Sequence, residues 1–266
     1  MFRLNSSFAT LPVGALLPLL CSVSALISAQ PAAAAAEAGP LPKLAGVWDM
    51  DHKNYKSSTR FSAKERIGID VDGKAPPLQP WAQQLLDKRV NDADQNDKIF
   101  ANNAAKCLPQ GIPYMLFAAV DGPIQILENG DQITILSTEM NEQWLVYVGG
   151  QHKKSPDPSY HGDSVAHWEG DTLIIDTIGI GADKTTIDQV GTPHSDDLHV
   201  VTRIHRTGPD DLEVRILLDD PKAFLRPWER SVMYHRAKPG ARIDEYVCEN
   251  TANGPDASGF QGFRAP

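Results

Sequence analysis

The chain has few cysteines and no clustered positive charge. Its 266 residues include 3 Cys, and 25 Lys and Arg stand against 34 Asp and Glu, which gives a formal net charge of −9. Contacts to nucleic-acid phosphates and to anionic lipid headgroups need clustered cations. The composition therefore argues against nucleic acid and membrane surfaces as partners, and a small molecule is the expected ligand.

The sequence signatures of common cofactor and metal sites are also missing. The sequence contains no glycine-rich phosphate loop, no dinucleotide fingerprint, no closely spaced histidine pair on a helix and no glycine-rich calcium loop. No two cysteines lie close together, so a zinc–thiolate site is not supported. We therefore predict neither a resident metal nor a cofactor.

A long apolar run lies near the N-terminus, at residues 11–27, after Arg3 and before the small residues 32–36. This pattern predicts a secretory signal peptide over residues 1–36, with a membrane anchor as the alternative. We expect a periplasmic or secreted protein that has no membrane attachment once the signal is removed. The remaining chain, with 41% hydrophobic residues overall, suits one domain at residues 44–250, between a linker at 37–43 and a flexible tail at 251–266.

Export would leave two cysteines, Cys107 and Cys248, in an oxidising compartment. A disulfide between them is the expected outcome, and two buried free thiols are the alternative. Because the loop between them is long, the bridge would stabilise the fold by about 4 to 5 kcal/mol in the loop-entropy view.

Short alternating apolar segments separated by turn residues predict a mainly β fold. Asn129-Gly130 is a strong hairpin signal, and Gly46-Val47-Trp48 is typical of the first strand of lipocalin-like barrels. An apolar stripe predicts one amphipathic helix at residues 79–93. We expect an antiparallel meander that closes into a lipocalin-like β-barrel. Its strands are predicted at residues 44–50, 124–128, 132–138, 143–148, 165–168, 172–178, 198–205, 212–218, 229–235 and 243–248.

Two polar clusters flank the central hairpin and are the predicted catalytic groups. The first contains His161 and Asp163, and the second contains His194 and His199. Imidazole titrates near neutral pH and a carboxylate can orient it, so these side chains suit general acid/base chemistry. The alternative is structural: His194 and Ser195 cap a turn, and Asp163 satisfies backbone donors there. Ser164 leads into a strand, which argues against the strand-to-helix elbow of a serine esterase.

Four further residues are predicted to contact the ligand. Arg203 lies with His199 on the polar face of its strand, which either faces solvent or lines a polar cavity. Trp168 is a core residue or a stacking surface for the ligand. Tyr114 and Met115 end a turn-rich segment that begins at Cys107 and is expected to form an ordered loop near the site.

Several motifs occur in a specific order: GDSVAHWEGDTLIIDT (162–177), PHSDDLHVVTR (193–203), DDPKAFLRPW (219–228) and EYVCEN (245–250). Together they resemble a largely uncharacterised family of exported bacterial proteins, over roughly residues 44–250. The resemblance implies export and a shared β fold but no particular reaction. The family pattern often has His where this chain has Asp163, which weakens any site that needs a histidine there.

The favoured function is an exported, cofactor-independent acid/base enzyme of the lyase, isomerase or hydratase type, acting on a small, possibly aromatic molecule inside the barrel. One alternative is a lipocalin-like carrier, which needs a mostly apolar cavity with few polar anchors. Another is a metal-dependent hydrolase that uses the same histidines and Asp163. The sequence identifies neither the substrate nor the oligomeric state. Convergence of His194, His199 and Asp163 on one cavity would favour the enzyme.

Overall fold

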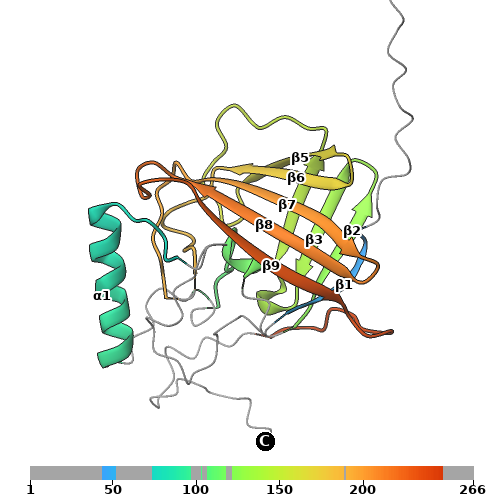
Figure 1. The fold of residues 1–266 in the computed structure, drawn as a ribbon, viewed down its shortest axis with the longest axis horizontal. Helices are drawn as coiled ribbons and strands as arrows, with labels where there is room; N and C mark the ends of the chain where they lie inside the picture. Colours follow the sequence, from blue (N-terminus) through green and yellow to red (C-terminus); the bar gives the residue numbers. More distant parts are fainter. Residues whose placement is uncertain are drawn as a thin grey trace, which may run out of the picture. The chain divides into compact units, whose positions relative to one another are not determined.

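The computed structural model describes residues 44–51, 74–96, 103, 107–117, 122–188 and 190–247, with side chains left out at 93–96 (Figure 1). The predicted signal peptide, linker and tail lie outside the described residues, as does Cys248. The chain divides into Met1–Ala38 and Gly39–Pro266, and everything described belongs to the second unit.

Nine strands form a closed barrel in sequence order, with β9 pairing back onto β1, and one α-helix accompanies it (Figure 1). The predicted β-barrel with one helix is confirmed. Alternation of apolar and polar residues located the strands well, and the bounds of β4 and β6 match the predicted ranges. The elements are β1 (Gly46–Met50), α1 (Pro80–Asn96), β2 (Ile124–Asn129), β3 (Gln132–Ser137), β4 (Gln143–Val148), β5 (Asp163–Glu169), β6 (Thr172–Ile178), β7 (His199–Gly208), β8 (Asp211–Asp219) and β9 (Trp228–Arg236).

One neighbouring pair, β4 and β5, is parallel, whereas every other pair of neighbours is antiparallel. Strand directions alternate around a meander, so closing an odd number of strands must bring two strands of the same direction together. The parallel pairing is short, with Tyr147 opposite Val165 and Val148 opposite Ala166. Parallel neighbours need a connection that returns along the barrel. Residues 149–162 form that return connection, and they include His152.

The predicted strand at 243–248 is wrong over its described part, because residues 241–247 form no strand. β9 already closes the barrel by pairing with β1, with Trp48 opposite Arg236 and Met50 opposite Tyr234. The remaining segment therefore has no free strand edge to join.

The barrel interior is filled by large apolar side chains. Trp48, Trp144, Trp228 and Tyr234 are fully buried and belong to one continuous core. The loop at residues 111–117 adds to this core, and the Tyr234 hydroxyl donates to the Leu116 carbonyl at 2.8 Å. Interior positions on neighbouring strands are mostly Ile, Val and Leu, as the alternation predicts.

Helix α1 packs through Ala82 and Leu86, which are buried in the same core. The indole N–H of Trp81 donates to the Lys222 carbonyl at 2.8 Å, and Leu78 forms a β-bridge with Phe224. The helix therefore docks against the segment between β8 and β9. Among the described helices, none is long and apolar enough to cross a membrane.

Candidate functional site on the outer barrel wall

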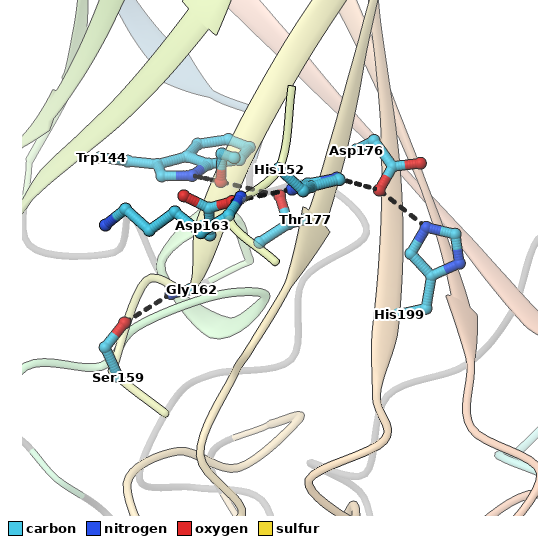
Figure 2. Close-up of polar contacts among 10 residues, drawn as sticks. Trp144, His152, Ser159, Gly162, Asp163, Asp176, Thr177 and His199 are labelled. Carbon is cyan, nitrogen blue, oxygen red and sulfur yellow. Dashed lines mark hydrogen bonds and ion pairs between the residues drawn. The ribbon is translucent and has the colours of Figure 1, made fainter. Parts of the chain in front are cut away.

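The connection from β4 to β5 places His152 against the outside of the barrel. Its Nδ1 lies 2.9 Å from Asp163 Oδ2 on β5, and its Nε2 lies 2.9 Å from Asp176 Oδ1 on β6. Figure 2 shows the imidazole between the two carboxylates. Carboxylate oxygens only accept hydrogen bonds, so this geometry suits a protonated ring that donates from both nitrogens.

His199 on β7 contacts the same carboxylate from the other side. Its Nε2 lies 2.9 Å from Asp176 Oδ1, the oxygen that also faces His152 (Figure 2). We call the series Asp163, His152, Asp176 and His199 the outer-wall chain. Strand parity explains its position, because Asp176 alternates with the buried residues Ile175 and Thr177 and so points outward.

Asp163 is held by the turn before it and by the residue after it. Gly162 has φ 66°, and a Cβ there would lie 2.5 Å from the Ile178 carbonyl oxygen, so the sharp entry into β5 requires glycine. Ser164 is buried, and its Oγ accepts from the Trp144 indole at 2.7 Å and lies 2.9 Å from Thr177 Oγ1. This bridge reinforces β5 beside its short parallel pairing.

The two partners of the His152–Asp163 contact have pKa values shifted in opposite directions. Burial would lower the pKa of His152, but hydrogen bonds and charge from Asp163 and Asp176 raise it overall. Burial would raise the pKa of Asp163, but the His152 contact and the Lys153 backbone N–H at 3.0 Å lower it. Asp163 is therefore ionised at neutral pH, and His152 keeps its proton to a higher pH than a free histidine.

A pocket of about 420 Å³ opens beside Asp163 on the same outer wall. Within the described chain, Asp163 accepts its hydrogen bonds from His152 and the Lys153 backbone through Oδ2, and none through Oδ1. Its side chain is only 10% exposed and lines the pocket, so Oδ1 is the carboxylate oxygen left for a ligand. The pocket is lined by Asp131, Tyr147, Val148, Gly149, Gly150, Gln151, Lys153, Asp163 and Val165.

His194, predicted to be catalytic, is buried away from these contacts. Its Nδ1 donates to the Ser195 carbonyl at 2.8 Å, and its Nε2 lies 2.8 Å from the Thr185 hydroxyl. Burial lowers its pKa, which keeps the ring neutral. The described interactions do not join His194 to Asp163 or His199, and the structural alternative describes its position better.

His161 also lies apart from the outer-wall chain. Its Nε2 is 2.8 Å from Glu142 Oε2, and that buried carboxylate accepts the backbone N–H groups of Gln110 and Gly111 at 2.7 and 2.8 Å. Glu142 thus fixes the 107–117 loop to the barrel, with His161 as its third partner. Of the four predicted catalytic residues, the described contacts connect two, Asp163 and His199, through His152 and Asp176.

The predicted ligand contacts lie elsewhere than the pocket lining. Tyr114 and Met115 are buried in the core, and Trp168 packs against it. Arg203 sits on the outward face of β7, as the parity predicted, but does not line the pocket. Cys107 is disulfide-bonded, and because Cys248 lies outside the described residues, their pairing stays a prediction.

Sequence reasoning missed His152 and Asp176, the two central members of the outer-wall chain. A charged residue at an outward position among apolar neighbours in β6 was the available signal for Asp176. No local pattern marks His152, since its position depends on the return connection between parallel strands.

Among the described residues, no three His, Cys, Asp or Glu side chains converge in a way that could hold a metal ion. No protein-family model matches the chain, and no curated protein matches its sequence.

Proposed function

We propose that the protein is an exported acid/base enzyme that acts on a small organic molecule at the outer-wall pocket. The main support is that the ionised Asp163 lines the pocket while His152 contacts its Oδ2, and Asp176 in turn contacts the other nitrogen of His152. Perturbed carboxylate–imidazole pairs at a pocket are typical of functional sites.

In this proposal Asp163 is the catalytic base. Oδ1 takes a proton from a carbon next to a substrate carbonyl, and the electron pair moves to the carbonyl oxygen. Lys153, which lines the same pocket, donates a hydrogen bond to that oxygen. Return of the proton to a different carbon gives an isomerase, and departure of a leaving group gives a lyase. General base catalysis of this kind contributes about 10² to 10⁴-fold.

His152 is a positioning residue, since it acts through Asp163. Its hydrogen bond and charge lower the pKa of Asp163, and Asp176 fixes the ring orientation. His199 holds the far side of Asp176 and completes the support. Hydrogen-bonded supporting residues of this type set the geometry that a catalytic group needs.

The proposal moves the ligand from the barrel interior to its outer wall. Trp48, Trp144 and Trp228 fill the interior with the other core residues, whereas a carrier would need an open apolar cavity there. Export to the periplasm or beyond, and a small molecule as the partner, are parts of this proposal and rest on the N-terminal pattern and the family resemblance.

The test is mass spectrometry of a small-molecule panel, including phenolics, lignin-type dimers, lactones and terpenoids, incubated with the mature protein. We expect a product in molar excess over protein, lost in Asp163→Asn and retained in His167→Gln. His167 is a matched control because it lies outward on the same strand but pairs with the exposed Glu169. Product formation that persists in Asp163→Asn contradicts the proposal. Compounds retained unchanged at one per chain would identify a carrier instead.

A further inference from the structure

The pocket combines an aromatic surface with a backbone wall formed at Gly149 and Gly150. Tyr147 points outward from β4 with 47% of its surface exposed, directly opposite Val165 on β5. A Cβ at Gly150 would stand 3.3 Å from Tyr147 Cβ and 3.5 Å from Val165 Cγ1. The backbone at Gly150 therefore packs closely against both side chains, and any side chain at this position would crowd this end of the pocket. A flat face of this kind suits a ring that stacks on it.

The polar groups of the pocket include both donors and acceptors. Asp131 and Asp163 provide carboxylate oxygens, Lys153 provides an ammonium group, and Gln151 can donate and accept. A carboxylate group of a ligand would use only the donors, and an ammonium group would use only the acceptors. A hydroxyl group uses both, because its oxygen accepts while its proton is donated.

We propose that the outer-wall pocket binds a ring that carries adjacent hydroxyl groups. The ring stacks on Tyr147, one hydroxyl donates to Asp163 Oδ1, and the neighbouring hydroxyls pair with Lys153 and Asp131. Sugars and catechols share this chemistry. The inference deepens the proposed function, since both place Asp163 against the ligand.

Isothermal titration calorimetry with four probes tests the inference. Methyl α-glucopyranoside and catechol carry the adjacent hydroxyls, and tetrahydropyran and anisole are the matched rings that lack them. We expect one of the hydroxylated probes to bind and its matched ring to bind at least about tenfold more weakly, as for loss of one hydrogen bond to a charged group. The two arms distinguish a sugar from a catechol.

Three variants locate the binding. Asp163→Asn and Tyr147→Ala should each weaken the hydroxylated probe about tenfold, which corresponds to one charged hydrogen bond or one stacked ring. Gly150→Ala should weaken it by narrowing the pocket, and Leu127→Ala, exposed on β2, is the control that should bind normally. Thermal melting confirms that each variant is folded.

The outcomes separate this inference from the proposed function. Equal binding of hydroxylated and matched rings overturns the adjacent-hydroxyl chemistry but leaves the acid/base proposal standing if panel turnover still needs Asp163. Absence of binding by all four probes to the folded protein also overturns the inference. Turnover that survives Asp163→Asn overturns the proposed function itself, whatever the probes do.

Discussion

His152 and His199 contact the same oxygen, Oδ1 of Asp176, each at 2.9 Å. Two imidazoles from a loop and a strand are thereby joined on the outside of a barrel whose inside is packed with apolar side chains. The arrangement is polar, partly exposed and next to a pocket, which is why we place the functional site on the wall instead of in the interior.

The outer-wall chain should make stability depend on pH. His152 has a raised folded-state pKa, so its contribution is full below the unfolded value of about 6.5 and is lost as pH rises through the folded value. Asp163 has a lowered pKa, so its contribution is present above about 3.9 and lost as pH falls through the folded value. The difference in unfolding free energy between wild type and His152→Gln, from urea melts, should be largest between about pH 4 and 6.5. A difference that is flat with pH would contradict the ion pair.

His194 should act on stability, not on chemistry. His194→Ala removes a buried ring and leaves the Thr185 hydroxyl and the Ser195 carbonyl without their partner, so we expect a loss of about 2 to 4 kcal/mol. Burial lowers the pKa of His194 in the folded protein. Below about pH 6.5 the unfolded chain therefore binds a proton that the folded chain does not, and the unfolding free energy should fall as pH falls. Chemical denaturation from pH 5 to 8 measures both effects. Catalytic loss in a variant of unchanged stability would restore the acid/base role.

Glu142 should be a structural anchor. Its buried carboxylate accepts two backbone N–H groups and faces His161, so Glu142→Gln leaves at least one donor poorly paired. We expect a loss of about 2 to 3 kcal/mol and faster amide hydrogen exchange at Gln110 and Gly111. Glu169→Gln, at an exposed position, is the control and should change neither quantity. Unchanged exchange in Glu142→Gln would show that the loop is held by other contacts.

The disulfide of Cys107 should have Cys248 as its partner. Peptide mapping without reduction should recover one linked pair, and thiol labelling of the folded mature protein should be absent until a reductant is added. Cys107→Ser should lower the unfolding free energy by about 2 to 5 kcal/mol. Recovery of Cys248 as a labelled free thiol in non-reduced protein would contradict the pairing.

Most of the barrel followed from the sequence because strand alternation and hairpin turns are local signals. Asn129-Gly130, for example, lies at the β2–β3 turn, and Gly130 has the positive φ of 63° that this turn needs. The parallel β4–β5 pair depends instead on the number of strands in the closed barrel. The strand predicted at 243–248, which does not form over its described residues, made the predicted number of strands even and so hid the return connection that places His152.

The candidate site was predicted only in part for the same reason. Asp163 and His199 were predicted as polar residues at strand ends. They are linked by contacts through His152 and Asp176, and the position of His152 depends on the strand topology. His194 has the same residue type and a similar motif context, yet it is buried between Thr185 and Ser195. Residue type alone suggested acid/base chemistry at both His194 and His199. They differ in burial, because His194 is buried and His199 is partly exposed.

Amide chemical-shift mapping with a panel compound that the protein converts or binds tests the location of the site most directly. We expect shifts concentrated at Gly149, Gly150, Lys153 and Asp163, with little change at the Trp48 and Trp144 indole N–H groups inside the barrel. Shifts concentrated at those indoles, with the outer wall unaffected, would show that the ligand enters the barrel and would contradict the outer-wall site.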